Sequence, residues 1–135
     1  MKQLFIKKEN SPRLLLFFAG WGSDENLFRR TVAEGYDCLL CFDYRTLEFD
    51  YSLLDGYREI RLLAWSMGVW VAGQILSGHT YPWEMKLAVN GTPFPIDDRQ
   101  GIAEAVFHGT LENFSDAALA RFRRRICGGG GGRRP

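Results

Sequence analysis

The sequence predicts an α/β fold in which a mostly parallel β-sheet carries helices on both faces. Short apolar runs of strand length alternate with segments of helical periodicity, which is the pattern of parallel strands joined by helical crossovers. Residues 14–18 form an apolar run without alternation, as expected of a strand buried on both faces. With 135 residues, 46% of them hydrophobic and 24% charged, the chain has room for one globular domain.

The expected strands are apolar runs that end at glycine or polar residues. They cover residues 3–7, 14–18, 38–42, 59–65 and 85–89. Residues 43–57 mix aromatic and charged side chains, which predicts a loop with one helical turn over residues 51–54.

The expected helices follow from apolar residues at helical spacing. The first begins at a cap, Ser23 or Asp24, and ends by Gly35. The last is capped by Ser115 and has apolar residues along one face. The remaining helices are expected over residues 67–76 and 99–107, and the last over residues 115–126.

Charge is distributed unevenly along the chain. Residues 1–120 carry a net charge of −5, whereas the last 15 residues carry +6 and include five consecutive glycines. Residues 128–135 hold almost no apolar surface to bury, so we expect a disordered Gly/Arg tail.

Composition argues against several classes of protein. The longest apolar run, residues 14–19, is far shorter than the roughly 20 residues of a membrane span, and residues 1–8 lack the apolar core of a signal peptide. We therefore expect a cytoplasmic protein that contacts neither membrane nor nucleic acid. Cys38 and Cys41 form a C-x-x-C spacing inside an expected strand, and with Cys127 the count is odd. We interpret the pair as small core residues rather than a redox or metal site, so no metal or cofactor is expected.

The segment Ala64-Trp65-Ser66-Met67-Gly68 carries the main chemical signal. A strand runs into a serine, and a glycine two residues later opens a helix. This is the G-x-S-x-G nucleophile elbow with alanine at its first position, where small residues let strand and helix approach. The alternative interpretation of Ser66 is an ordinary helix cap.

A nucleophilic serine also needs two donors for the oxyanion that develops on the substrate. The backbone N–H of Met67 is one candidate, and that of Trp21, in the loop Gly20-Trp21-Gly22 after an earlier strand, is the other. Trp65, next to the serine, is expected to line an acyl pocket, although a core role would also suit an aromatic residue here.

The base and the acid of a catalytic triad are not evident. His79 follows the helix after Ser66 and is expected at the wrong end of the sheet, and His108 falls at the end of an expected helix. Asp97 and Asp98 follow the last strand, in a position that such folds sometimes use for the acid. We favour the alternative interpretation, a turn-forming aspartate pair.

Four segments resemble one family, the BioG pimeloyl-acyl-carrier-protein methyl ester esterases of biotin synthesis. They are Phe17-Phe18-Ala19-Gly20-Trp21-Gly22, Trp65-Ser66-Met67-Gly68-Val69, residues 90–98 (Asn-Gly-Thr-Pro-Phe-Pro-Ile-Asp-Asp) and residues 122–128. The resemblance implies an α/β-hydrolase-like fold and hydrolysis of the methyl ester of pimeloyl-acyl carrier protein. It also implies that Ser66 is the nucleophile.

The same resemblance shapes the expected domain organisation. Residues 1–127 would be a partial α/β-hydrolase-like domain, with residues 94–127 as candidate lid or cap helices. Family members continue beyond the glycine run with further strands and the catalytic histidine, so the resemblance implies a C-terminally truncated chain. We expect it to hydrolyse esters poorly.

The partner implied by the family is an acidic acyl carrier protein, which favours a basic docking surface. Arg121, Arg123, Arg124 and Arg125 lie on the last expected helix and are candidates for it. The alternative is a solvated helix face whose cations favour the helix C-terminus. Two other functions stay open: a non-catalytic fragment that binds the carrier protein, and a generic carboxylesterase or thioesterase.

Overall fold

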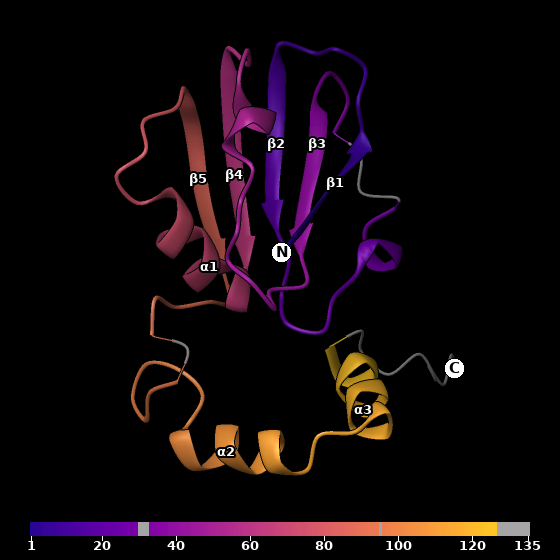
Figure 1. The fold of residues 1–135 in the computed structure, drawn as a ribbon, viewed down its shortest axis with the longest axis vertical. Helices are drawn as coiled ribbons and strands as arrows, with labels where there is room; N and C mark the ends of the chain where they lie inside the picture. Colours follow the sequence, from indigo (N-terminus) through magenta and orange to yellow (C-terminus); the bar gives the residue numbers. More distant parts are fainter. Residues whose placement is uncertain (30–32, 95, 127–135) are drawn as a thin grey trace, which may run out of the picture. The chain divides into compact units, whose positions relative to one another are not determined.

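The structure is a computed structural model that describes residues 1–29, 33–94 and 96–126 (Figure 1). The chain divides into two compact units, Met1–Pro95 and Ile96–Pro135. The expected tail at residues 128–135 lies outside the described residues.

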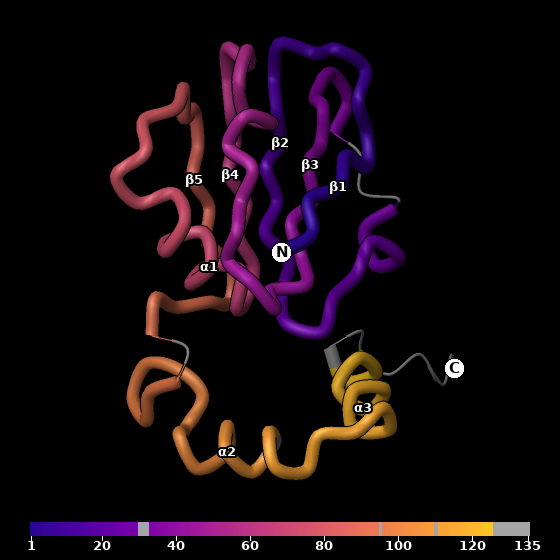
Figure 2. The backbone as a smooth tube through the Cα atoms, in the orientation of Figure 1, coloured from indigo at the N-terminus to yellow at the C-terminus, as the bar shows by residue number. Residues whose placement is uncertain are grey.

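The first unit is built on a five-stranded sheet (Figures 1 and 2) with the order β1-β3-β2-β4-β5. Strands β2, β3, β4 and β5 run parallel to one another, and β1 pairs antiparallel with β3. The mixed α/β class expected from the sequence is confirmed. The strands are β1 (Lys2–Lys7), β2 (Arg13–Phe18), β3 (Asp37–Phe42), β4 (Glu59–Trp65) and β5 (Trp83–Val89).

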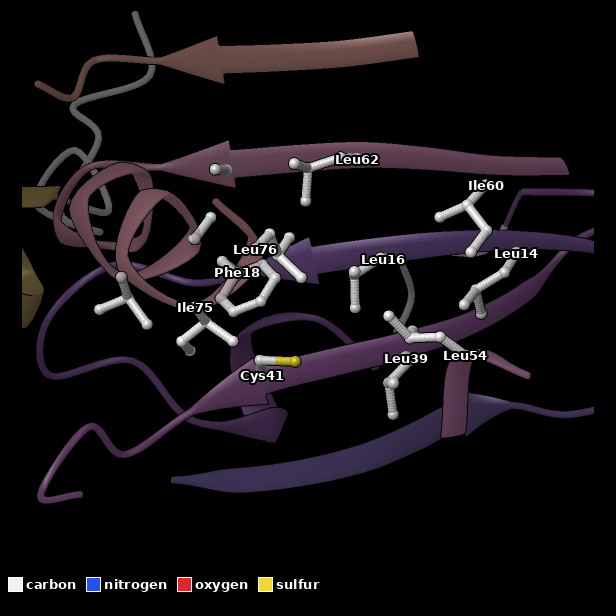
Figure 3. Close-up of a cluster of buried hydrophobic side chains, with 13 residues drawn as sticks. Leu14, Leu16, Phe18, Leu39, Cys41, Leu54, Ile60, Leu62, Ile75 and Leu76 are labelled. Carbon is white, nitrogen blue, oxygen red and sulfur yellow. The ribbon is translucent and has the colours of Figure 1, made fainter. Parts of the chain in front are cut away.

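Helix α1 (Met67–Leu76) covers one face of this sheet and has the bounds that the sequence predicts. Alternate residues of the strands point to α1, because successive side chains of a strand face opposite sides. Their side chains form the main core with Ile75 and Leu76 of the helix (Figure 3). The strand residues in this core include Leu14, Leu16, Phe18, Leu39, Cys41, Ile60 and Leu62.

The opposite face of the sheet carries a smaller cluster, in which Phe28 and Trp65 pack against Phe17, Ala19, Leu40 and Phe42. The helix expected between Asp24 and Gly35 is largely wrong: the structure has only a 3-10 helix, η1 (Glu25–Leu27), and residues 30–32 lie outside the described residues. The ring of Phe28 packs edge-on against Phe17, with centroids 4.7 Å apart. This tertiary contact outweighs a weak local propensity.

A second 3-10 helix, η2 (Tyr51–Leu54), confirms the turn expected in the long loop after β3. The side chain of Asp50 caps it by accepting the N–H of Ser52. Leu54 is buried in the main core, and Phe49 of the same loop stacks on Phe18 of β2 with ring centroids 6.0 Å apart, so apolar side chains tie the loop to the sheet.

Asp37, at the start of β3, is a buried carboxylate that joins three segments of the first unit. It accepts the N–H groups of Glu9 (2.8 Å) and Ser11 (3.2 Å) and the hydroxyl of Tyr57 (2.6 Å). Burial alone would raise the pKa of Asp37. The hydrogen bonds, helped by the charge of Lys8, outweigh burial and hold that pKa below its ordinary value.

Cys38 and Cys41 are buried free thiols in β3, as their position in a strand predicts. Burial raises the pKa of Cys38 to about 11 and raises that of Cys41 further. Neither thiol is therefore set up as a reactive thiolate.

The described part of the second unit contains α2 (Glu104–Glu112) and α3 (Asp116–Ile126). The expectation of a helix over residues 99–107 is shifted: Asp97 accepts the N–H groups of Arg99 and Gln100 in a turn, and Asp98 accepts that of Glu104 where α2 begins. Ser115 caps α3 as predicted, accepting the N–H of Ala118 at 3.1 Å. None of the described helices is long and apolar enough to cross a membrane.

Candidate active site

Ser66 lies at the junction of β4 and α1 in a backbone conformation that few residues other than glycine adopt. Its φ is 57° and its ψ is −124°. Its side chain makes no capping hydrogen bond to the residues that the structure describes, although it occupies the N-cap position of α1. Ser66 therefore does not act as an ordinary helix cap. A strained serine in a strand-to-helix turn is instead the geometry of a nucleophile elbow.

Glycines allow three backbone segments to meet around this serine. A Cβ atom on Gly68 would lie 2.3 Å from the carbonyl oxygen of Phe18, which a side chain could not tolerate. A Cβ on Gly20 would lie 3.2 Å from the Cβ of Ser66, and one on Gly91 would lie 2.4 Å from the Ser66 carbonyl oxygen. Close approach therefore requires glycine at positions 68 and 91, and it leaves only a tight fit for a side chain at position 20.

The three segments are the carboxyl ends of neighbouring parallel strands. The N–H of Ser66 donates to the carbonyl of Val89 at the end of β5, at 2.9 Å, while Ala19 after β2 donates to Cys41 at the end of β3, at 3.0 Å. Ligand sites of open α/β sheets form at the carboxyl ends of the strands. Ser66 thus lies at the end of the sheet where a binding crevice is expected.

The loop after β2 turns tightly in front of this edge. The N–H of Ser23 donates to the carbonyl of Gly20 at 3.3 Å. The Gly20–Trp21 peptide is trans, so its N–H points away from its C=O. The Trp21 N–H therefore points away from the Ser23 amide. Met67 supplies the first amide of α1, and such amides have no intrahelical acceptor.

Tyr44 anchors the same loop through a hydrogen bond from its hydroxyl. Its hydroxyl donates to the carbonyl oxygen of Ala19 at 2.6 Å, and the carbonyl oxygen of Cys41 lies 3.1 Å away. Burial raises the pKa of Tyr44, so the hydroxyl stays protonated as a donor. The sequence reasoning missed this residue; its one signal is its place just after β3, at the edge that carries Ser66.

Trp65 faces the side of the sheet away from α1. Its ring packs near Phe28, with centroids 6.2 Å apart, and its edge lies 3.1 Å from where a Cβ on Gly20 would stand. A separate groove of about 320 Å³ runs between α1 and β5 and is lined by residues such as Val69, Leu76 and Trp83. Neither Trp65 nor Ser66 is among its lining residues.

The structure does not bring a histidine of the first unit to Ser66. His79 lies after the C-terminal end of α1, at the opposite end of the sheet, where its ring stacks on Tyr51 with centroids 4.3 Å apart. His108 is an exposed residue of α2 in the second unit, 3.8 Å from Glu104. Asp97 and Asp98, also in that unit, bind backbone amides as turn residues do.

The arginines of α3 lie in the last turns of that helix. Arg121, Arg124 and Arg125 are exposed, and Arg123 is half-buried. The exposed three have the i, i+3, i+4 spacing that puts side chains on one helix face. Among the residues described, no cluster of His, Cys, Asp or Glu is suited to hold a metal ion.

A family model and a solved structure both match this chain under the name BioG. A family model described as "Pimeloyl-ACP methyl esterase BioG" matches residues 1–132. The crystal structure of a selenomethionine-labelled BioG from Haemophilus influenzae superposes with a TM-score of 0.83 at 45% sequence identity, covering 95% of this chain and 58% of that chain.

Two curated relatives are longer than this chain. A protein of Bacteroides fragilis (strain 638R) named malonyl-[acyl-carrier protein] O-methyltransferase is 53% identical over 116 residues, which are 86% of this chain and 24% of that protein. An uncharacterized protein of H. influenzae (strain ATCC 51907 / DSM 11121 / KW20 / Rd) is 47% identical over 116 residues, 85% of this chain and 53% of that protein. The chain thus spans about a quarter and about half of the two relatives. Because the family model matches nearly its whole length, this chain belongs to the BioG family.

Proposed function

We propose that this chain carries the nucleophile and the oxyanion-binding loop of a serine esterase with an α/β-hydrolase-like arrangement. The observation that carries the proposal is the backbone of Ser66, held at φ 57° between β4 and α1 without a capping role among the described residues. Such strain persists where surrounding packing enforces it, and it concentrates at functional sites. Gly68 and Gly20 supply that packing.

In this mechanism the Oγ of Ser66 gives its proton to a base and attacks the ester carbonyl carbon. The carbonyl electrons move to oxygen, and the N–H groups of Met67 and Trp21 stabilise the oxyanion. The intermediate expels methoxide, which takes up a proton and leaves as methanol. Water then attacks the acyl group on Ser66 and releases the carboxylate. The base is not assigned to a residue of the first unit.

The substrate we propose is the methyl ester of pimeloyl-acyl carrier protein, in biotin synthesis in the cytoplasm. The description of the BioG family supports it. Trp65, beside the nucleophile and partly accessible, would contact the acyl chain. The helices of residues 94–127 would act as a lid. Within it, the exposed Arg121, Arg124 and Arg125, together with Arg123, would dock the acidic carrier.

A second candidate function is carrier binding without catalysis. The specific observation that favours it is the exposed arginine face of α3, because docking there requires no base beside Ser66. Binding that weakens with salt and with Arg124→Glu, but no hydrolysis under any condition, would support this alternative. A generic carboxylesterase would instead hydrolyse short esters without any dependence on these arginines.

The proposal can be tested by adding imidazole, which can act as the base that is not assigned to a residue of the first unit. Imidazole is added to the chain and the release of methanol from the methyl ester of pimeloyl-acyl carrier protein is followed. We expect slow hydrolysis that imidazole accelerates and that Ser66→Ala removes. Ser77→Ala, at the other end of α1, is the matched control and retains the rate. Loss of hydrolysis in His108→Ala would identify His108 as the base.

A further inference from the structure

Residues with a left-handed backbone gather at one end of the sheet. Four described residues other than glycine have a positive φ: Asn10 (57°), Asp43 (56°), Ser66 (57°) and Asn90 (47°). Asp43, Ser66 and Asn90 directly follow β3, β4 and β5, so they lie at the carboxyl ends of three parallel strands. Asn10 lies between β1 and β2, at the opposite end of β2. Because backbone strain concentrates at functional sites, Asp43 and Asn90 are candidates for a role beside Ser66.

Asp43 lies too far along the sheet to reach the serine. In the strand order β3-β2-β4, strand β2 separates the ends of β3 and β4, which puts Asp43 roughly 10 Å from Ser66 at the usual spacing of neighbouring strands. Its carboxylate accepts two hydrogen bonds from the guanidinium of Arg45 and lies 3.6 Å from the ammonium of Lys2. The hydrogen bonds from Arg45 lower the pKa of Asp43 to about 2. The charge of Asp43 is thus already paired.

Asn90 lies directly beside the serine. Trp65 pairs with Val89 in the parallel ladder of β4 and β5 (Figure 1), so Ser66 and Asn90 are the next residues of two neighbouring strands. The N–H of Ser66 donates to the carbonyl of Val89 at 2.9 Å, and a Cβ on Gly91 would lie 2.4 Å from the Ser66 carbonyl oxygen. The backbone on both sides of Asn90 is therefore held against Ser66. Asn90 itself is exposed, so its carboxamide is accessible to a substrate.

The groups around Ser66 offer a separate direction to each substituent of a bound ester. The strand order β2-β4-β5 puts the loop after β2 and Asn90 on opposite sides of Ser66. In the proposed function the oxyanion points to the β2 side, to the N–H groups of Trp21 and Met67. The acyl chain contacts Trp65, which packs on the face of the sheet away from α1. The alkoxy oxygen is the remaining substituent of the carbonyl carbon, and the β5 side, where Asn90 lies, is the direction left for it.

We propose that the carboxamide of Asn90, beside Ser66 at the end of β5, donates a hydrogen bond to the alkoxy oxygen of the scissile ester, an assignment that rests on the proposed function. When the oxyanion re-forms the C=O bond, the C–O bond breaks and its electron pair goes to the alkoxy oxygen. The Asn90 N–H stabilises this charge until the oxygen takes up a proton and leaves as methanol. A thioester sulfur in the same place accepts hydrogen bonds only weakly. Asn90 is therefore a specificity-determining residue that favours oxygen esters over thioesters.

The test compares two small substrates with the same acyl group, the methyl ester and the S-methyl thioester of butanoic acid. The kcat/KM of the whole chain for each is measured with added imidazole, and the rate of Ser66→Ala is subtracted. Asn90→Gly removes the carboxamide, and glycine adopts a φ of 47° without strain. We expect this variant to lose roughly tenfold in kcat/KM for the ester, the effect of one neutral hydrogen bond, and less than about twofold for the thioester. Asn90→Asp keeps the shape but has no N–H donor when ionised, so it should lose at least as much for the ester.

Asn10→Gly is the matched control, because it makes the same exchange at a φ of 57° at the opposite end of β2. It should leave both rates unchanged, while circular dichroism reports whether each variant folds. A merely structural role of Asn90 would lower both rates together, and an ester-to-thioester ratio that stays constant in Asn90→Gly would overturn the assignment. So would an ester rate that Asn90→Asp retains, or a ratio that falls as far in Asn10→Gly. If Ser66→Ala hydrolyses both substrates as fast as the wild-type chain, the proposed function fails and the assignment of Asn90 fails with it. A constant ratio with hydrolysis that depends on Ser66 overturns the assignment of Asn90 alone.

Discussion

A Cβ atom on Gly68 would lie 2.3 Å from the carbonyl oxygen of Phe18, so the first turn of α1 and the end of β2 meet at backbone distance. We predict that Gly68→Ala destabilises the chain by about 3 kcal/mol, because helix and strand must separate. Gly73→Ala is the matched control in the same helix, where a Cβ would meet nothing within 4 Å. It should stabilise the chain by about 1 kcal/mol through helix propensity. Urea denaturation measures both, and equal effects would contradict the packing described here.

Because the backbone of Ser66 is strained, a residue that adopts this conformation without strain should stabilise the chain. Ser66→Gly should be more stable than Ser66→Ala by about 1 kcal/mol, since glycine adopts a φ of 57° without strain. At Ser77, where φ is −60°, the order of the two variants should reverse. Thermal unfolding of the four variants checks this. If alanine is the more stable residue at position 66, Ser66 is not strained.

Tyr44 is predicted to be a positioning residue for the oxyanion loop. Tyr44→Phe removes the hydroxyl that donates to Ala19, leaves a buried acceptor unpaired and should cost about 1–2 kcal/mol of stability. In the imidazole-assisted assay kcat should fall while KM stays nearly constant, because in the proposed mechanism the Trp21 N–H of this loop stabilises the developing oxyanion. Tyr51→Phe is the control: its hydroxyl donates to Ile75 at 2.7 Å, near the opposite end of α1. It should lose similar stability without changing kcat.

Asp37 predicts how stability depends on pH. Its folded-state pKa is lowered, so its contribution is present above the unfolded pKa of about 3.9 and is lost as the pH falls through the lower folded value. Asp37→Asn should cost roughly 2–3 kcal/mol at pH 7 and flatten the loss of stability below about pH 4. Urea unfolding at several pH values measures this. If Asp37→Asn loses stability at low pH in the same way as the wild-type chain, other groups are responsible for that loss.

Segments governed by local patterns were predictable from the sequence. The run from Leu62 to Gly68 encodes strand, turn and helix in consecutive residues, and the bounds of β4 and α1 agree with the expectation. Cys38 and Cys41 were recognisable as core residues for the same reason.

Features that depend on distant contacts or on side-chain hydrogen bonds to the backbone were not predictable. The missing α-helix near Phe28 reflects its contact with Phe17, and the later start of α2 reflects the amides held by Asp97 and Asp98. Tyr44 reaches Ala19 across 25 residues of sequence. Periodicity carries no information about contacts of this kind.

The central claim is that Ser66 is the nucleophile, and methanol release from the methyl ester of pimeloyl-acyl carrier protein tests it most directly. The rate with added imidazole is compared between the wild-type chain and Ser66→Ala. The account predicts that imidazole accelerates hydrolysis by the wild-type chain and that Ser66→Ala falls to the rate of imidazole alone. An imidazole-dependent rate that is equal in both proteins would contradict it.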